Sequence, residues 1–586
     1  MNQQRRHVLI RSAATAAAAA LGLPGLSARA GGEERAAAGI DIHIELHAIQ
    51  DSVAIREGAQ TRVWRYQGKL LRGDASALDA WAGNYLGPII RVRRGQRVRI
   101  DLINGLPEST IIHWHGLHVS DDMDGHPRHA IKPGERYVYE FTVVNRAGSY
   151  WFHPHPHGRT GKQIHFGLAG LFLVSDDEEA GLDLPTGPHD LPLVIQDRTF
   201  DDNNQFVYLS ESVAGAASQD PEQRGMMDHG MMGGNMGGMM GGDGRRGGMG
   251  GMGGMGGMGG MGGMGGMGGM GGMGQMMARM MGVFGEQILV NGRPGASLEV
   301  ERRPYRLRLL NASNARMYKL AWHDQSPLTV IGTDGGLLAA SLQRDYVMLA
   351  PAERIDLWVD FGRWTAGAEL TLQSLAFEGG MTMGGMMGGM MGGMMGGMMG
   401  GTALPDGAPF PVLKLRVEGG TRSSAAPPQR LSRLQRLQPR VAVNFNHPKV
   451  FNLTMGMMVW GINGQGFDML GASPLETVKL GTHEVWEFRN DAATGMMGMT
   501  MPHSMHVHGL QFRVIGRSVA GKFSRQHVTV KAGFVDEGWK DTVLVMPGER
   551  VRILLGFADY PGLFPYHCHM LEHEDSGLMR NYLVKE

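Results

Sequence analysis

Short runs of alternating apolar and polar residues, separated by Gly, Pro and Asn, fill most of the chain. The apolar positions are Val, Ile, Leu and aromatic residues, as in RVRIDLING at 97–105. Alternation with a period of two is typical of strands that bury one face. We therefore expect an all-β protein.

One strand pair recurs three times along the chain. Its first strand is RVRIDLING (97–105), YRLRLLNAS (305–313) and EVWEFRND (484–491). Its second strand follows a Pro-[Gly/Ala]-Glu-Arg turn in KPGERYVYEF (132–141), APAERIDLWVDF (350–361) and MPGERVRILLGF (546–557). Such a repeat predicts three copies of one β-sandwich, which we place at about 41–180, 190–420 and 440–586. A Pro- and Arg-rich stretch, AAPPQRLSRLQRLQP, links the last two copies.

Two Met/Gly-rich segments, about 214–282 and 379–401, hold most of the 46 methionines. So much glycine cannot offset the entropy of ordering a chain, so we expect mobile loops inserted into the second domain. Their thioethers can capture copper; the alternative is a passive flexible linker.

The N-terminal residues 1–30 have the pattern of a twin-arginine export signal. Arg5 and Arg6 precede an Ala/Leu stretch, and an Ala-Arg-Ala sequence ends at Ala30. This pattern predicts a periplasmic protein, against the alternative of an ordinary basic N-terminus. No later segment approaches the about 20 apolar residues needed to cross a bilayer, so we expect no stable membrane insertion. The formal net charge is zero, which disfavours nucleic acid as a partner.

Four His-x-His pairs lie in the first and third copies of the repeat. In a strand, residues i and i+2 face the same side, so each pair directs two imidazoles at one point. A single pair is commonly solvated or hydrogen-bonded, but four at matching places predict one shared cluster of Cu, Zn or Fe. The middle copy has no such pair, so we expect it to be structural. The pairs are His113 and His115, His153 and His155, His506 and His508, and His567 and His569.

The single cysteine, Cys568, lies between two of these histidines. It cannot form an intrachain disulfide, and its sulfur should point away from the rings of His567 and His569. With His503 and His573 it makes the two-His, one-Cys set of a blue-copper site, against the alternative of an inert buried thiol. One strand would then join the two centres.

These motifs resemble those of the multicopper oxidases, and of the bacterial copper-efflux oxidases in particular, from about residue 41 to the end. The resemblance is carried by HWHGLHVSDDMDG, WFHPHPHGRTG, FGLAGLFLV, GWKDTV and HCHMLEHEDSG. It implies three cupredoxin-like Greek-key domains, four copper ions, and one-electron oxidation of a substrate coupled to reduction of O2 to water.

The resemblance also implies a role for each motif residue. His113 and His506 would hold type 2 copper, and His503, Cys568 and His573 would hold type 1 copper. The type 3 pair would be held by His115, His153, His155, His508, His567 and His569. Two acids, Asp124 and Glu574, would supply protons; the alternative is that they are surface acids. His118 and His157 match no ligand position.

One departure concerns the axial ligand of type 1 copper. The family's methionine, ten residues after the cysteine, is here Leu578, and Met579 follows. Because neighbours on a strand face opposite sides, Met579 should point away, which leaves a three-coordinate site of raised potential. The alternative is a bulge that turns Met579 towards the copper.

A second departure concerns the substrate site. The Met-rich insertion of the family's third domain is short here (FNLTMGMMVWG), and Met499 replaces an expected acid. A candidate Cu(I) site is a methionine group, since thioethers suit Cu(I), although core packing is the alternative. The group is Met455, Met457, Met458, Met497, Met499 and Met501.

We therefore expect an exported, monomeric oxidase that converts Cu(I) to Cu(II) for copper tolerance, with O2 as acceptor. The second hypothesis is a laccase-like oxidase of phenols or other small organic reductants. A third, from another class, is a copper-sequestering protein without turnover.

Overall fold

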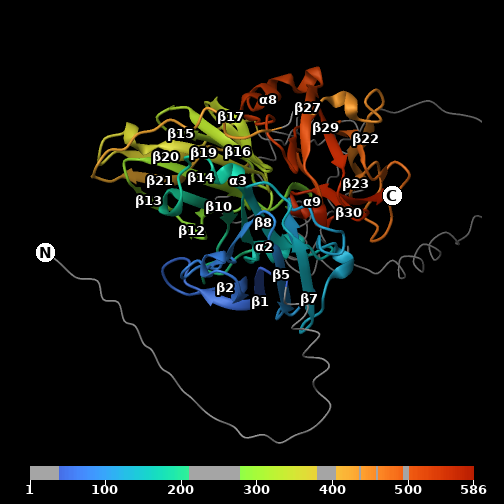
Figure 1. Cartoon of the computed structure of the whole chain (residues 1–586), viewed down its shortest axis with the longest axis horizontal. Coiled ribbons are helices and arrows are strands. Elements are labelled where there is room, and N and C mark those ends of the chain that lie inside the picture. Colours follow the sequence, from blue (N-terminus) through green and yellow to red (C-terminus); the bar gives the residue numbers. More distant parts are fainter. Residues whose placement is uncertain (1–38, 210–277, 379–403, 435–436, 457–458, 492–500) are drawn as a thin grey trace, which may run out of the picture.

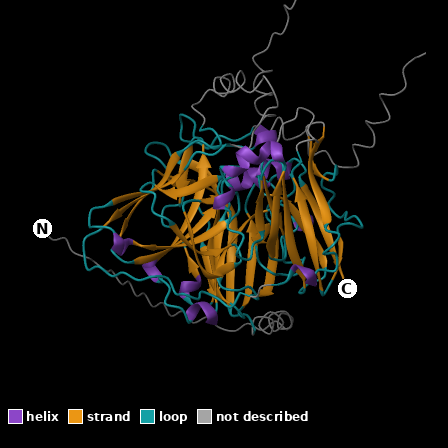
Figure 2. Cartoon of the chain, turned by 90° about the horizontal axis from the view of Figure 1, so that it is seen from above, coloured by secondary structure: helices purple, strands orange, loops and turns teal. Residues whose placement is uncertain are grey.

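The computed structural model describes residues 39–209, 278–378, 404–434, 437–456, 459–491 and 501–586. The described strands form six sheets, and each third of the chain supplies two of them (Figure 1). Strands dominate and the helices are few and short (Figure 2), so the all-β prediction is confirmed. The export signal, almost all of the two Met/Gly-rich segments, and Met457, Met458, Met497 and Met499 lie outside the described residues.

The first sandwich packs a sheet of order β2-β1-β5-β7 on one of order β3-β4-β9-β8-β6. Apolar side chains of both sheets, such as Val98 and Phe152, share one core. The strands are β1 (Ile42–Val53), β2 (Thr61–Arg72), β3 (Leu78–Asp79), β4 (Ile89–Arg93), β5 (Arg97–Asn104), β6 (Ile112–His115), β7 (Arg136–Thr142), β8 (Gly148–Pro154) and β9 (Gly170–Ser175). Two helices, α2 (Thr160–His165) and α3 (Asp177–Ala180), flank β9.

The second sandwich pairs a sheet of order β12-β11-β10-β14-β19-β16-β17 with one of order β13-β21-β20-β15-β18. Leu309 and Leu372 lie in their common core. The strands are β10 (Asp190–Arg198), β11 (Gln287–Val290), β12 (Arg293–Pro294), β13 (Ser297–Val300), β14 (Pro304–Asn311), β15 (Tyr318–Trp322), β16 (Leu328–Thr333), β17 (Gly336–Arg344), β18 (Val347–Leu349), β19 (Arg354–Asp360), β20 (Glu369–Ser374) and β21 (Phe410–Val417).

The third sandwich consists of sheets β23-β22-β25-β29-β27 and β24-β31-β30-β26-β28. The strands are β22 (Lys449–Gly456), β23 (Val459–Ile462), β24 (Thr477–Lys479), β25 (Thr482–Arg489), β26 (His503–Val507), β27 (Phe512–Val519), β28 (Thr542–Val545), β29 (Glu549–Phe557), β30 (Gly562–Cys568) and β31 (Met579–Lys585). The helices α8 (Ser524–Val528) and α9 (Leu571–Asp575) follow β27 and β30.

The strand pair that recurs in the sequence is an antiparallel pair in each sandwich: β5 with β7, β14 with β19, and β25 with β29. In each sandwich the first of these strands also pairs in parallel with an earlier strand, namely β1, β10 or β22. The same alternation therefore folds into the same local topology three times.

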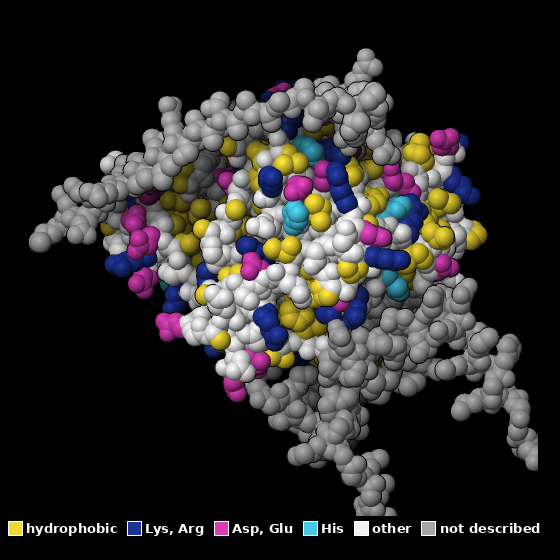
Figure 3. Space-filling model, turned by 90° about the horizontal axis from the view of Figure 1, so that it is seen from below, with side chains coloured by type: hydrophobic (Ala, Val, Ile, Leu, Met, Phe, Trp, Pro, Cys, Tyr) yellow, Lys and Arg dark blue, Asp and Glu magenta, His cyan; other side chains and the backbone are white. Residues whose placement is uncertain are grey.

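The three sandwiches meet around β8 of the first (Figure 1). This strand contacts β16, β17 and β19 of the second sandwich, and the adjoining α2 contacts α9 of the third. On the face seen in Figure 3, acidic and basic side chains are interspersed, as expected for a chain of zero formal net charge. Within the part of the chain that the structure describes, no helix is long and apolar enough to cross a membrane.

Candidate metal centre

Eight histidines converge where the first and third sandwiches meet. In the first, β6 pairs with β8 so that His113 lies opposite His153. In the third, β26 pairs with β30 so that His506 lies opposite His567. Strand alternation then brings the second member of each His-x-His pair to the same face. All eight side chains are buried.

Two of these histidines form a pair of their own. Nε2 of His113 lies 3.2 Å from Nε2 of His506. Their other ring nitrogens contact backbone carbonyls: Nδ1 of His113 lies 2.7 Å from the Asp124 oxygen, and Nδ1 of His506 lies 2.8 Å from the Asp541 oxygen. These carbonyls accept the Nδ1 protons, which leaves both Nε2 lone pairs free for a metal.

The other six histidines form two groups of three. In one, Nε2 of His153 lies 3.3 Å from Nδ1 of His115 and 3.3 Å from Nε2 of His569. In the other, Nε2 of His567 lies 3.2 Å from Nε2 of His155 and 3.0 Å from Nε2 of His508. Each group draws on both sandwiches.

This donor set fits metal ions. Nitrogens about 2 Å from one ion lie about 3 Å apart, which is the separation seen in all three groups. Burial lowers the pKa of His153 to about 3 and that of His155 to about 4, so these two rings are neutral. Neutral imidazole is the form that binds metal.

Cys568 belongs to a second site, on the opposite face of β30. It lies across from Met505 and both side chains are buried in the core of the third sandwich, whereas the neighbouring His567 joins the cluster. Its Sγ lies 3.5 Å from Nδ1 of His503 and 3.8 Å from Nδ1 of His573. Burial raises the pKa of the thiol to about 12, so a metal must displace its proton.

Apolar groups and a backbone carbonyl enclose this second site. The ring of Trp460 lies 4.9 Å from that of His503 and 4.4 Å from that of His573. Nε2 of His573 lies 2.9 Å from the carbonyl oxygen of Met280, a residue of the first Met/Gly-rich segment. His573 is 0% exposed, so its outer ring edge is covered by the protein itself.

Leu578, which replaces the expected axial methionine, lies next to Cys568. Its carbonyl accepts a hydrogen bond from the backbone N–H of Cys568, at 3.0 Å, and its side chain lies in the same apolar cluster as Cys568. Met579 lies opposite His567 in the β30–β31 register, and so on the face away from the thiol.

Both candidate proton donors are buried beside the cluster. Oδ2 of Asp124 lies 2.7 Å from Nδ1 of His508, while its Oδ1 has no hydrogen-bond partner among the described residues. Burial raises the pKa of Asp124 well above its ordinary value.

Glu574 lies beside the other group of three. Its Oε2 is 3.1 Å from Nδ1 of His567 and its Oε1 is 3.6 Å from Nε2 of His155. Burial opposes ionisation of Glu574, but these two histidines outweigh it and lower its pKa to about 2. Neither Asp124 nor Glu574 is a surface acid.

The two described candidate methionines, Met455 and Met501, are buried in the apolar cluster that contains Cys568. Met280 and Met281, at the end of the first Met/Gly-rich segment, lie in the same apolar cluster. The sequence did not single them out. The unassigned histidines lie elsewhere: Nδ1 of His118 pairs with Asp559 at 2.6 Å, and His157 packs on Phe467.

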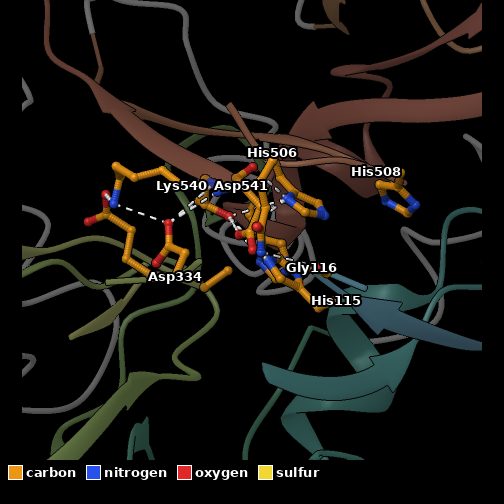
Figure 4. A network of polar contacts seen from close by, with 12 residues as sticks. His115, Gly116, Asp334, His506, His508, Lys540 and Asp541 are labelled. Atoms are coloured by element: carbon orange, nitrogen blue, oxygen red, sulfur yellow. Dashed lines mark hydrogen bonds and ion pairs between the residues drawn. The ribbon is translucent and has the colours of Figure 1, made fainter. Parts of the chain in front are cut away.

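The sequence reasoning missed a polar group that supports the cluster. Oδ1 of Asp541 lies 3.0 Å from Nε2 of His115 and 2.7 Å from Nη1 of Arg354 (Figure 4). Its signal in the sequence is the motif GWKDTV, which contains Asp541. Arg354 lies in the second sandwich, which has no His-x-His pair.

Comparison with known proteins identifies the family. Two family models described as multicopper oxidase match residues 63–179 and 442–586. The solved structure of the McoA multicopper oxidase from Aquifex aeolicus is 30% identical, has a TM-score of 0.66, and is matched over 96% of its length and 93% of this chain. The multicopper oxidase mco of Staphylococcus haemolyticus is 27% identical over 498 residues, 85% of this chain and 81% of that protein. The laccase of Bacillus subtilis is 26% identical over 568 residues, 90% of each chain.

The chain therefore belongs to the multicopper oxidase family. The predicted cupredoxin-like fold, the oxidoreductase activity and the need for copper cofactors are confirmed at this level.

Proposed function

We propose that the protein is an exported cuprous oxidase that oxidises Cu(I) to Cu(II) for copper tolerance and reduces O2 to water. The observation that carries this proposal is the enclosure of the Cys568 site. The ring edge of His573 is covered by the Met280 carbonyl, and methionine side chains lie in the surrounding apolar cluster. Thioethers are soft ligands that suit Cu(I), so methionines around an enclosed site favour Cu(I) over a larger organic reductant.

The proposal assigns four copper ions. His503, Cys568 and His573 would hold type 1 copper, and His113 with His506 would hold type 2. The two groups of three, around His153 and His567, would hold the type 3 pair. Bound copper supplies one-electron redox chemistry at each site. The first 30 residues would direct export to the periplasm, and the three predicted domains would follow the three sandwiches.

The chain's own groups connect the two sites and handle protons. Cys568 is bonded through the backbone to His567 and His569, so the path from thiolate to cluster runs through adjacent residues. Burial raises the pKa of the Asp124 carboxyl, which favours the protonated form that can donate a proton beside His508. Glu574 is ionised and can accept a proton for relay towards the cluster.

A laccase-like oxidase of small organic reductants is the second candidate. The relatives named laccase, from Bacillus stratosphericus and Bacillus subtilis, are 27% and 26% identical. Leu578 also favours this candidate, since a site without an axial thioether has a higher potential and can oxidise phenols. Copper sequestration without turnover is disfavoured by the complete set of buried donors.

The test compares Cu(I) and a phenol on one copper-loaded sample, by steady-state O2 consumption. A variant that lacks 226–274 and 381–399 removes the repeated methionines but keeps Met280, which covers His573. A second variant keeps the length and replaces those methionines with leucine, which separates loss of the thioethers from loss of the segments.

We expect both variants to raise the KM for Cu(I) and to leave phenol oxidation unchanged. Phenol turnover that exceeds Cu(I) turnover in the wild type would favour the laccase reading instead. Absence of O2 uptake with either reductant would reject both the cuprous oxidase and the laccase-like oxidase.

A further inference from the structure

The arginine of the recurring Pro-x-Glu-Arg turn differs in burial between the second sandwich and the other two. The side chains of Arg136 and Arg550, in the first and third copies, are 49% and 46% exposed. The side chain of Arg354, at the same place in the second copy, is 0% exposed. Burial of a guanidinium is expensive unless all of its charge and its donors are satisfied.

Every donor of the Arg354 guanidinium has an acceptor. Nε donates to the Ser149 carbonyl at 2.9 Å. Nη1 donates to Oδ1 of Asp541 at 2.7 Å and to the Ala352 carbonyl at 3.0 Å. Nη2 donates to Oδ2 of Asp541 at 2.5 Å and to the Asp334 carbonyl at 3.0 Å. These are the five N–H donors that arginine has, so no other side chain reproduces the contact.

The five acceptors come from all three sandwiches. Ser149 is in β8 of the first, Ala352 and Asp334 belong to the second, and Asp541 precedes β28 of the third. Figure 4 shows Asp541 between the Asp334–Lys540 pair and the histidines His115 and His506. Arg354 therefore lies at the point where the three sandwiches meet.

Asp541 transmits this contact to the histidine cluster. Its Oδ1 lies 3.0 Å from Nε2 of His115, and its carbonyl oxygen lies 2.8 Å from Nδ1 of His506. His115 is unlike the other seven cluster histidines, which face one another through Nε2, because it faces His153 through Nδ1. An acceptor at Nε2 holds the proton there and leaves the Nδ1 lone pair directed at the cluster.

Further buried charged residues surround the Arg354–Asp541 ion pair. The Arg354 backbone N–H donates to Oδ1 of Asp334 at 2.8 Å. Nζ of Lys540 lies 3.1 Å from Oδ2 of Asp334 and 3.0 Å from Oε1 of Glu353. All of these side chains are buried. Arg354 thus balances Asp541, and Lys540 is shared by Asp334 and Glu353, so these two cations and three carboxylates form one buried network.

The residue after His115 is a glycine that lies against the Arg354–Asp541 ion pair. Gly116 has a φ of +87°, and a Cβ on it would lie 2.4 Å from Oδ2 of Asp541 and 3.0 Å from Nη2 of Arg354. Any other residue would push into the ion pair as well as strain the backbone.

We propose that Arg354 is a positioning residue for the histidine cluster, through which the second sandwich sets the orientation and the tautomer of His115 and His506. The second sandwich would then act on the cluster without supplying a histidine to it. The inference rests on the proposed role of the eight histidines as copper ligands, and is independent of which reductant the enzyme oxidises.

The experiment uses copper-loaded full-length protein. Arg354→Lys keeps the charge with fewer donors, and Arg354→Gln loses the charge. Arg550→Gln, at the same turn of the third sandwich, is the matched control. The readouts are the visible absorption of the Cys568 site, the EPR signal of type 2 copper, bound copper per chain, and turnover. Asp541→Asn tests the same contact from its other side if the Arg354 variants fold poorly.

In the Arg354 and Asp541 variants we expect full absorption from the Cys568 site, a changed type 2 EPR spectrum, and turnover reduced by about 10- to 100-fold, as for other groups that orient metal ligands. Arg354→Lys should lose less turnover than Arg354→Gln. Arg550→Gln should match the wild type in every readout. A wild-type EPR spectrum in both Arg354→Gln and Asp541→Asn would overturn the proposal. So would a loss of the Cys568 absorption in step with the cluster signal, which would indicate a purely structural role. These signals do not depend on Cu(I) turnover, so failure of the proposed function would be seen separately.

Discussion

At the scale of single residues, one side chain sets the character of the Cys568 site. Leu578 lies in the apolar cluster with Cys568, whereas Met579 lies opposite His567 on the other face of the sheet. The order of these two residues along the chain therefore decides whether a thioether or an isobutyl group lies on the side of Cys568.

Leu578→Met should bring a thioether to the type 1 copper and lower its reduction potential, because an axial sulfur stabilises the oxidised ion. Redox titration followed by the visible absorption measures this change. Met579→Leu is the control and should leave the potential unchanged. A shift in Met579→Leu of the size seen in Leu578→Met would mean that Met579 is the axial ligand.

A buried ion pair makes a second residue-scale prediction, on pH. Nε of Arg308 in β14 donates to Oδ1 of Asp190 at 2.6 Å, and its Nη2 donates to Oδ2 at 2.8 Å. Burial opposes ionisation of Asp190, but Arg308 outweighs it and lowers the pKa of the carboxyl. A lowered pKa stabilises the fold above the ordinary value, about 3.9, and this contribution is lost as pH falls through the lowered pKa.

Asp190→Asn should therefore cost about 2 kcal/mol at pH 7, and the gap to the wild type should narrow below about pH 4. Urea unfolding at pH 7 and pH 3, monitored by tryptophan fluorescence, measures both values. Asp202→Asn, at an exposed position, is the control. A gap that stays constant across this range would show that the charge of Asp190 is not the stabilising feature.

At the scale of elements, the short helix α9 connects most of the site. It carries His573 and Glu574 and begins two residues after the cluster histidine His569. Oε1 of Glu572 accepts from the Tyr208 hydroxyl at 3.0 Å and from Nδ2 of Asn314 at 2.8 Å, and its Oε2 accepts from the Val283 backbone N–H at 3.1 Å. Glu572 thus binds Tyr208, which precedes residues 210–277, and Val283, which follows them, and holds both against the helix that carries His573.

Glu572→Ala should release these contacts, with a cost of about 1–3 kcal/mol for the buried groups left unpaired. Val283, which Glu572 binds, lies three residues after Met280, which contacts His573. The visible absorption of the Cys568 site should therefore also shift. Thermal unfolding and absorption spectra measure the two effects. Glu369→Ala, at an exposed position of β20, should change neither. Lower stability with an unaltered spectrum would limit the role of Glu572 to anchoring.

At the scale of the whole molecule, the metal centre is also an interface. The cluster histidines come from the first and third sandwiches, and Arg354 of the second is hydrogen-bonded to both others. Eight imidazoles packed together leave ring nitrogens directed at one another, and bound metal would satisfy them.

Removal of copper should therefore lower the unfolding temperature of the whole molecule. A metal that binds only the folded state stabilises it by about 4 kcal/mol when its free concentration is a thousand times its Kd. Scanning calorimetry of copper-loaded, chelator-treated and reloaded protein measures this. Cys568→Ser, which disturbs a site inside the third sandwich alone, should have a smaller effect. An unfolding temperature indifferent to copper would contradict a bridging role for the cluster.

The parts that could be predicted from the sequence follow from short-range geometry. Period-two alternation indicated the strands, and the turn residues indicated the repeated pair that became β5–β7, β14–β19 and β25–β29. The same period explains why Cys568 lies in the core while His567 joins the cluster, since neighbouring residues on a strand face opposite sides.

What only the tertiary structure decided are the contacts between residues far apart in the chain. Arg136, Arg354 and Arg550 have the same local sequence, yet only Arg354 is buried, because the neighbours of each turn are set by how the sandwiches pack. The covering of His573 by Met280, 293 residues away, is of the same kind. The sequence by itself thus determined the fold class and the candidate donors, because these depend on local periodicity. The partners that orient those donors depend on the packing of the three sandwiches, which no local pattern records.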